Sequence, residues 1–272
     1  MSAELTARQQ REVAYHRDYA QRKADKAAEP VTLDVVMSGG RRWWNAYWHT
    51  YGLLQRHDLR GKTVLVPGCG FGEDAIRIAS LGAAVRAFDL SPEIVAVTRA
   101  RAHQLGYHNL RVDVMPCEDL AYPADSFDFV FLMDILHHVD VAAACAEIRR
   151  VARPGAVMIG DELYTSRFLQ RSVRQSYLVN KVVYPRMVRY VYGRTDPYIT
   201  DDERKIDERD LAHVVALCPG LDCAWFNTVV GRLVPDRSDR IARLDRALTR
   251  SFGRLGRLFA GRVVFEGRVA KG

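Results

Sequence analysis

The stretch VLVPGCGFGEDA, from Val64 to Ala75, decides the fold. It begins with an apolar run typical of a buried strand, continues into three glycines spaced two residues apart, and ends with two acids. Glycines directly after a strand let a ligand approach the backbone closely, and open parallel sheets bind ligands at the carboxyl ends of their strands. The stretch therefore predicts a ligand-binding loop between a first strand and a helix.

The spacing of these glycines argues against two phosphate-binding motifs. Gly68, Gly70 and Gly72 give GxGxG, whereas the dinucleotide fingerprint needs its third glycine where Glu73 stands. A P-loop would end in Gly-Lys-Ser or Gly-Lys-Thr, which this stretch does not have. An acid next to the loop disfavours a pyrophosphate and suits a ligand that carries an ammonium and a sulfonium.

Strands and helices alternate outward from this loop. Ser91 is a good N-cap and Pro92 suits a first helical turn, so a helix should begin there. The predicted strands span 62–68, 83–89, 110–115, 127–134, 156–163, 221–229 and 261–272, and the predicted helices span 73–82, 92–105, 141–152 and 206–218. We therefore predict an α/β fold, a Rossmann-like seven-stranded and mostly parallel sheet flanked by helices.

The rhythm of the sequence also suggests how the chain is divided. Residues 1–60 are predicted as an N-terminal helical cap, 61–163 and 206–272 as the core, and 164–205 as a helical lid inserted into it. The lid is rich in tyrosine and arginine, and Tyr177 and Tyr184 are its candidate substrate contacts. Aromatic walls favour a sizeable apolar or planar acceptor, because insertions carry specificity on a shared fold.

Composition narrows the class of protein. With 272 residues, 48% of them hydrophobic, the chain can bury a large core. No apolar stretch approaches the roughly 20 residues of a membrane-spanning helix, so we expect a cytoplasmic protein. The five scattered cysteines predict neither a disulfide framework nor a zinc site, and no metal is expected. The net charge of +7 fits a solvated basic surface better than a nucleic-acid partner.

Asp89 ends the second predicted strand, where a carboxylate can accept hydrogen bonds from ribose hydroxyls. Taken together, the GxGxG loop, Asp89 and the segment EDLAYPADSFDFVFLMDILHHV, residues 118–139, resemble the class I S-adenosylmethionine-dependent methyltransferases. The closest branch is that of the ubiquinone and menaquinone biosynthesis methyltransferases, methyltransferase type 11. The resemblance covers about residues 60–163 and implies S-adenosylmethionine as cofactor and S-adenosylhomocysteine as product.

The resemblance also assigns cofactor contacts. The glycine loop would pack against the methionine part of the cofactor, Asp89 would hold the ribose, and Leu90 would lie against the adenine. Pro116 replaces the family's acid, so the backbone amide of Cys117 and the carboxylate of Glu118 or Asp119 are left to read the adenine. The implied contacts are Gly68, Cys69, Gly70, Gly72, Asp89, Leu90, Cys117, Glu118, Asp134, Arg42 and Tyr19.

Two histidines are the candidate catalytic residues. His137 and His138 follow the fourth strand, and the resemblance implies that they face the transferred methyl group. A histidine can remove a proton near neutral pH, but a pair here is also common in the family without a catalytic role. In the tryptophan-rich stretch before the first strand, Trp43 and Trp44 either wall the substrate pocket or pack at the sheet edge.

These observations predict a methyltransferase for a small aromatic or lipophilic natural product, quinone or lipid, with oxygen favoured over nitrogen or carbon as the acceptor atom. Two alternatives stay open: a non-methylating enzyme of the same fold that catalyses a cyclisation, and an RNA methyltransferase. The arginine-rich segment 236–260 has a helical leucine stripe and lies either on the domain or on an anionic membrane surface. The chain is expected to be a monomer or a homodimer.

Overall fold

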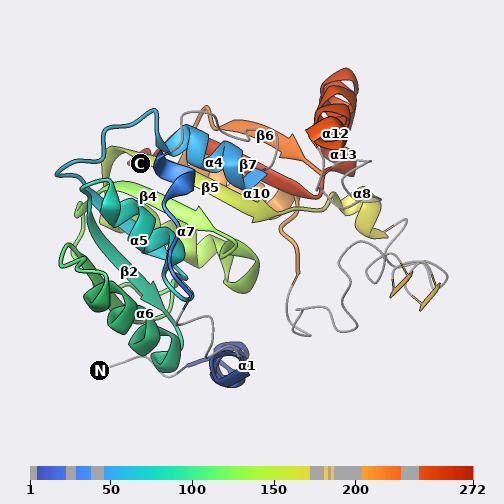
Figure 1. The fold of residues 1–272 in the computed structure, drawn as a ribbon. Coiled ribbons are helices and arrows are strands. Elements are labelled where there is room, and N and C mark those ends of the chain that lie inside the picture. Colours follow the sequence, from blue (N-terminus) through green and yellow to red (C-terminus); the bar gives the residue numbers. More distant parts are fainter. Residues whose placement is uncertain are drawn as a thin grey trace.

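A computed structural model describes residues 5–22, 29–37, 46–171, 181–182, 185–186, 204–227 and 239–271. These residues build a seven-stranded sheet with helices on both faces (Figure 1). The strands are β1 (Thr63–Pro67), β2 (Ala84–Asp89), β3 (Leu110–Val114), β4 (Phe127–Met133), β5 (Ala152–Leu163), β6 (Asp222–Phe226) and β7 (Arg262–Arg268). The main helices are α1 (Ala7–Arg22), α4 (Ala46–Leu54), α5 (Glu73–Ser80), α6 (Pro92–Gln104), α7 (Val141–Val151), α10 (Glu208–Leu217) and α12 (Asp239–Ser251).

The order of strands fixes where a ligand can bind. The sheet runs β3-β2-β1-β4-β5-β7-β6, and β7 is antiparallel to both of its neighbours. The predicted Rossmann-like, mostly parallel sheet is therefore confirmed. The chain passes to opposite sides of the sheet after β1 and β4, and such a switch point opens a crevice at the carboxyl ends of these strands.

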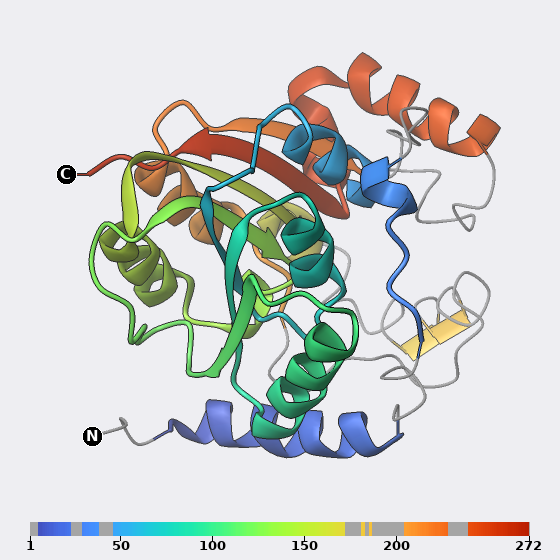
Figure 2. The same cartoon turned by 60° about the vertical axis from the view of Figure 1, so that its left-hand side comes forward.

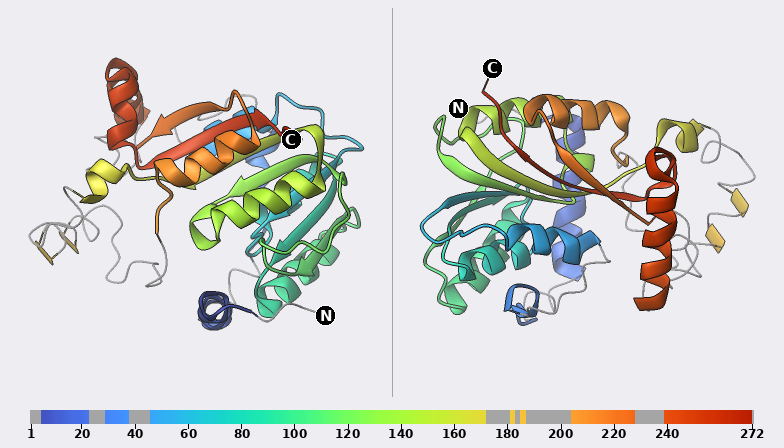
Figure 3. Two further views of the ribbon diagram at one scale, coloured as in Figure 1. Left: turned by 180° about the vertical axis from the view of Figure 1, so that it is seen from behind. Right: turned by 90° about the horizontal axis from the view of Figure 1, so that it is seen from above.

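Two apolar cores hold the layers together. On one face, α4, α5 and α6 cover the sheet (Figure 1), and Tyr51, Ile76 and Phe131 are buried between them. On the other face, α7 and α10 pack side by side (Figure 3), with Ile148 and Leu217 fully buried. Because both faces are covered, the central strand β1 and most of β4 are continuous apolar runs.

The predicted start of α6 is confirmed in detail. The Oγ of Ser91 accepts a hydrogen bond from the backbone N–H of Ile94 at 3.4 Å, and Pro92 occupies the first turn. The predicted arginine-rich helix is divided into three parts, because the chain turns after Ser251. These parts are α12, the 3₁₀ turn η4 (Gly253–Leu255) and α13 (Gly256–Phe259); residues 236–238 lie outside the described residues.

The N-terminal helix α1 lies across the end of α6 (Figure 2), where Arg17 Nε donates to Glu93 Oε1 at 2.9 Å. Two shorter helices belong to regions around the core: α3 (Asp34–Met37) before α4, and α8 (Arg167–Leu169) after β5. Most of the predicted lid, with Tyr177 and Tyr184, lies outside the described residues, and the domain boundaries stay predictions. Among the described helices, none combines the length and the apolar character needed to cross a membrane.

Candidate cofactor and substrate site

A cavity of about 390 Å³ opens at the carboxyl edge of the sheet, where β1, β2 and β4 end. Its lining combines the glycine loop, the end of β2, the turn after β3, the segment after β4 and one side of α1. Ten of the predicted site residues line it: Gly68, Cys69, Gly70, Asp89, Leu90, Cys117, Glu118, Asp134, His137 and His138. The sheet topology therefore brings together residues that lie up to 70 positions apart in the sequence.

The first two glycines of the loop differ in what surrounds them. Both have a left-handed backbone, with φ of 60° at Gly68 and 51° at Gly70. A Cβ added at Gly68 would stand 2.4 Å from the Cδ1 of Ile135, in the segment after β4, whereas a Cβ at Gly70 would meet no atom within 4 Å. Gly68 thus lets two parts of the protein pack together, and Gly70 keeps space open.

Asp89 links this loop to β2. Its Oδ2 accepts from the backbone N–H of Gly70 at 3.1 Å, and its Oδ1 accepts from the N–H of Ser91 at 3.0 Å. An ionised carboxylate has about four acceptor positions, so each oxygen keeps capacity for one more donor. Asp89 therefore fixes the loop and can still bind a pair of hydroxyl groups at the cavity.

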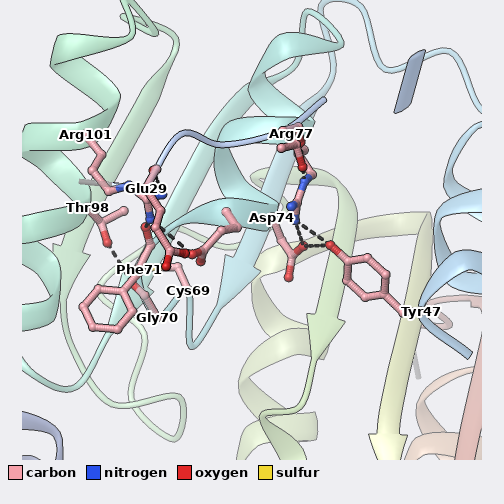
Figure 4. Close-up of polar contacts among 11 residues, drawn as sticks. Glu29, Tyr47, Cys69, Gly70, Phe71, Asp74, Arg77, Thr98 and Arg101 are labelled. Carbon is pink, nitrogen blue, oxygen red and sulfur yellow. Dashed lines mark hydrogen bonds and ion pairs between the residues drawn. The ribbon is translucent and has the colours of Figure 1, made fainter. Parts of the chain in front are cut away.

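Side chains behind the loop hold it in place (Figure 4). Thr98 Oγ1 donates to the carbonyl of Gly70 at 2.7 Å, and the buried Arg101 donates to the carbonyl of Phe71 at 2.6 Å. Farther along, Asp74 lines the cavity and accepts from the hydroxyl of Tyr51 at 2.6 Å and from Arg77 at 3.1 Å. The loop is thus fixed from behind while its front faces the cavity. Gly72 does not line the cavity and instead precedes α5.

The turn after β3 forms a second wall. Met115, Pro116, Cys117 and Glu118 line the cavity there, opposite Leu90. The two carboxylate oxygens of Glu118 are both used, one by the backbone N–H of Asp140 at 3.0 Å and the other by Gln9 of α1 at 3.2 Å. Burial raises the pKa of the Cys117 thiol, so this side chain is neutral and apolar.

His137 is held by a buried carboxylate. Glu162, at the end of β5, is fully buried, and its Oε2 lies 2.9 Å from the Nδ1 of His137. Its Oε1 accepts from the backbone N–H groups of Ile135 and Leu136 at 2.7 and 2.6 Å. One side chain therefore shapes the whole turn after β4 and orients the imidazole. A carboxylate on one nitrogen of a histidine fixes the position of its proton.

His138 meets a second carboxylate, which comes from α1. Glu12 Oε1 lies 3.5 Å from the Nδ1 of His138, and Glu12 Oε2 lies 3.5 Å from the Nε2 of His16. Burial alone would raise the pKa of Glu12, but the hydrogen bonds and charges of the two imidazoles outweigh it, so the pKa is lowered. For His16, burial opposes the charged form, yet Glu12 and Asp89 raise the pKa above its usual value.

Asp134 belongs to an ion-pair network under the cavity. Its backbone is left-handed, with φ of 51°, and its Oδ1 accepts from Arg262 at 2.6 Å. The Nε of Arg262 donates to the buried Asp161 at 2.8 Å, which also accepts from Thr50 at 3.2 Å. Burial raises the pKa of Asp161 to about 6 although Arg262 lowers it. This network ties β7 and α4 to the turn after β4.

One group among the described residues offers metal-ligand atoms close together. Atoms of Asp134, His137 and Glu162 lie within 4.8 Å of one another. Both oxygens of Glu162 already accept hydrogen bonds from the protein, and Asp134 is paired with Arg262. The group is therefore satisfied by protein partners, and the expectation of no metal stays a prediction.

The charge of the cavity is its most distinctive property. Five carboxylates line it, and no lysine or arginine is found among its described lining residues. The carboxylates belong to Glu12, Asp74, Asp89, Glu118 and Asp134. Desolvated negative charge repels a phosphate and attracts a cation. The lining thus favours a ligand that carries positive charge, and the predicted exclusion of a pyrophosphate has a physical basis.

Sequence reasoning missed several of these residues. Glu12 and His16 stand four positions apart on α1, a spacing that places them on one helix face and could have suggested a pair. Glu162 lies at the carboxyl end of the fifth strand as Asp89 lies at that of the second, and ligand-binding residues gather at these strand ends, so the same rule could have found Glu162. The roles assigned to Arg42, Trp43 and Trp44 fall outside the described residues, as does the side chain of Tyr19 on α1.

Known proteins share this arrangement. Residues 65–160 match the family model of a methyltransferase domain. This segment runs from β1 to β5 and contains the glycine loop, Asp89 and both histidines. Residues 65–160 are thus similar to a methyltransferase domain. The resemblance inferred from the glycine loop, Asp89 and residues 118–139 is thereby confirmed at the level of the domain and the fold.

Relatives in sequence match this domain and part of its surroundings. A ubiquinone biosynthesis O-methyltransferase of Xanthomonas oryzae is 38% identical over 138 residues, which are 45% of this chain and 56% of that protein. A demethylmenaquinone methyltransferase of Tropheryma whipplei is 26% identical over 204 residues, 72% of this chain and 82% of that protein. The chain thus matches little more than half the length of its ubiquinone-type relatives.

The methyltransferase domain also has structural neighbours. A geranyl diphosphate C-methyltransferase from Streptomyces coelicolor, solved with Mg²⁺, a substrate analogue and S-adenosylhomocysteine, superposes with a TM-score of 0.61. The identity is 15%, and the superposition covers 98% of this chain and 100% of the other. At this identity the likeness establishes the fold, including elements outside residues 65–160.

Proposed function

We propose that the protein transfers a methyl group from S-adenosylmethionine to a small lipophilic acceptor, with a hydroxyl oxygen as the favoured acceptor atom. The acidic cavity at the switch point of the sheet is the observation that carries this proposal. The methyltransferase domain and the names of the sequence relatives support it.

The described residues fit this cofactor. Asp89 has free acceptor positions for two ribose hydroxyls, and Leu90, Met115 and Cys117 form an apolar wall suited to a purine. The open space in front of Gly70 suits the methionine part. When bound, S-adenosylmethionine supplies an activated methyl group on a sulfonium, and the surrounding carboxylates favour that charge over the anionic phosphates of a dinucleotide.

The histidines give the site a route for the proton of a hydroxyl acceptor. Both imidazoles line the cavity, and each lies beside a carboxylate, His137 beside Glu162 and His138 beside Glu12. A carboxylate orients its imidazole and stabilises the imidazolium formed when a proton is taken up. We assign His138 as the base, because His137 is nearly fully buried and its ring is held by Glu162.

The apolar part of the lining supports a lipophilic acceptor. Met133, Ile135, Val139 and Leu163 line the cavity together with the histidines, and no lysine or arginine is found among the described lining residues to pair with a phosphate or carboxylate on the substrate. Two relatives are named a ubiquinone biosynthesis O-methyltransferase and a demethylmenaquinone methyltransferase, which supports an acceptor of the quinone class. A quinol or a similar phenol therefore fits the site better than an anionic acceptor.

A transfer experiment tests the proposal. Purified protein is incubated with S-adenosylmethionine labelled in the methyl group and a cell extract, which is then fractionated into RNA, protein and small molecules. We expect label in the small-molecule fraction that partitions into organic solvent. His138→Gln should lower the rate about 100-fold without weakening cofactor binding, whereas the control His103→Gln, on α6 away from the cavity, should change neither.

Other outcomes discriminate the alternatives. Label recovered mainly in RNA would contradict a small-molecule acceptor and favour an RNA methyltransferase. Tight cofactor binding with no label in any fraction would contradict methyl transfer and favour an enzyme that uses the bound cation for another reaction. A cyclase shares this fold with a TM-score of 0.54, so the fold alone does not choose between the two.

A further inference from the structure

The arginine-rich helical segment α12–η4–α13 presents its apolar side chains to solvent. The leucine stripe of the sequence is turned outward in part, because the polar Asp245 and Thr249 occupy the buried side of α12. The exposed fractions of the large apolar side chains on α12, α13 and the adjacent α8 are 52% for Leu244, 43% for Phe252, 60% for Leu255, 38% for Phe259 and 56% for Phe168.

The elements that carry these side chains are neighbours. The hydroxyl of Ser166, which caps α8, donates to the carbonyl of Leu258 in α13 at 2.6 Å. Figures 1 and 3 both show α12 and α13 at the rim of the molecule with α8 beside α13. Single exposed apolar side chains are ordinary on a soluble protein, but several large ones gathered on neighbouring elements mark a binding surface.

The charge of this surface selects the partner. The twenty residues from Arg240 to Phe259 contain six arginines and one acid, and that acid, Asp245, is buried. Exposed arginines stand at 240, 243, 250 and 257, among the exposed leucines and phenylalanines. Between Arg240 and Phe259, exposed apolar side chains stand among exposed arginines without an exposed acid. This combination is suited to the interface of an anionic bilayer.

We propose that the surface made of α12, η4, α13 and α8 docks on membranes rich in anionic lipid. It stands at the same sheet edge as the cavity. Leu163, which lines the cavity, precedes α8 by four residues. Arg262, three residues after α13, contacts Asp134 in the lining. A protein docked through this surface turns that edge of its sheet toward the bilayer, where a lipophilic acceptor resides.

Co-sedimentation of the full chain with vesicles tests the proposal. We expect binding to vesicles of phosphatidylcholine mixed with phosphatidylglycerol, weaker binding at high salt, and little binding to phosphatidylcholine alone. Arg243→Gln with Arg250→Gln should lower the partition coefficient about fivefold per arginine. Phe252→Ser with Leu255→Ser should lower it about tenfold. The control Leu105→Ser changes a leucine that is 47% exposed at the end of α6 and should bind as the parent does.

Two results would overturn the proposal. One is a parent protein that stays in the supernatant with anionic vesicles, or surface variants that sediment as the parent does. The other is a dimer in sedimentation velocity that Phe252→Ser with Leu255→Ser dissociates, which would make this face a contact between two copies. Calorimetry with S-adenosylmethionine on the same proteins keeps this test separate from the proposed function, because vesicle binding does not require the cofactor.

Discussion

The two halves of the cavity are built in different ways. The half formed by the loop after β1 and the end of β2 is made mainly of backbone, with Gly70 and Asp89 joined by a 3.1 Å hydrogen bond. The half formed by the turn after β4 depends on side chains from distant elements, Glu162 from β5 and Glu12 from α1. The first half lies within about 25 residues of sequence. In the second half Glu162 stands 25 residues from His137, but Glu12 comes from 126 residues before His138.

Because the two halves are built differently, substitutions in the first should affect cofactor binding and substitutions in the second should affect folding. A side-chain change in the glycine-loop half should weaken the cofactor while the protein stays folded, because the loop is also fixed from behind by Thr98 and Arg101. A change at Glu162 should disturb the fold itself, since three donors depend on this buried carboxylate.

Glu162→Gln should lower the free energy of unfolding by about 3 kcal/mol, because an amide cannot accept from three donors and leaves buried polar groups unsatisfied. Chemical denaturation measures this change. The same carboxylate-to-amide substitution at the exposed Asp58, which pairs with Arg60, should leave the midpoint where it is. If Glu162→Gln unfolds like the parent, the turn after β4 does not depend on this residue.

Asp89→Ala should weaken the binding of S-adenosylmethionine about 100-fold, because two charge-assisted hydrogen bonds to the ribose hydroxyls are lost. Isothermal titration calorimetry measures the dissociation constant. Asp113→Ala removes a half-buried acid one strand away, on β3, which accepts from the hydroxyl of Tyr122, and it serves as the matched control. An unchanged dissociation constant for Asp89→Ala would place the ribose elsewhere.

Gly70→Ala and Gly68→Ala sharpen the comparison within a single loop. Both should cost about 1 kcal/mol of stability, because an L-residue is strained at positive φ. Gly68→Ala should lower stability further, because its added methyl group would collide with Ile135. Gly70→Ala should instead weaken cofactor binding about tenfold, because its methyl group fills space in the cavity. Thermal unfolding and calorimetry on both variants check this. Equal effects of the two substitutions on stability and on cofactor binding would mean that Gly68 and Gly70 do not have different roles in the loop.

Local patterns in the sequence were enough to predict the first half of the site and most of the sheet. A strand, a glycine turn and an acid at the next strand end are encoded by neighbouring residues, so Gly70 and Asp89 could be placed without coordinates. Glu12 could not, because nothing in the sequence says that α1 lies across the cavity. Packing between distant elements sets its distance to His138, and the same holds for Arg262 and Asp134.

The hold of α1 on the cavity should depend weakly on pH. Because the pKa of Glu12 is lowered in the folded protein, its carboxylate stabilises the packing of α1 at every pH above its usual pKa of 4.5. This stabilisation is lost only in strong acid. Because the pKa of His16 is raised in the folded protein, its imidazolium stabilises the packing of α1 fully below its usual pKa of 6.5. This stabilisation is lost as the pH rises through the raised pKa. The hold is therefore strongest between these two usual values.

Comparison with His16→Gln measures this effect. The thermal midpoint of the parent should exceed that of His16→Gln by about 1–2 °C at roughly pH 6, and the difference should vanish near pH 8 or above. A difference that grows as pH rises would reverse the sign and contradict a charged His16 beside Glu12.

The acidic cavity should select an adenosine ligand that carries an ammonium group over one that carries a pyrophosphate. Titration calorimetry on ligand-free protein tests it directly, with S-adenosylmethionine, S-adenosylhomocysteine and NADH added in separate runs. The account predicts saturable binding of the first two at the site that Asp89→Ala weakens, and none of NADH. Saturable binding of NADH without heat from S-adenosylmethionine would contradict it.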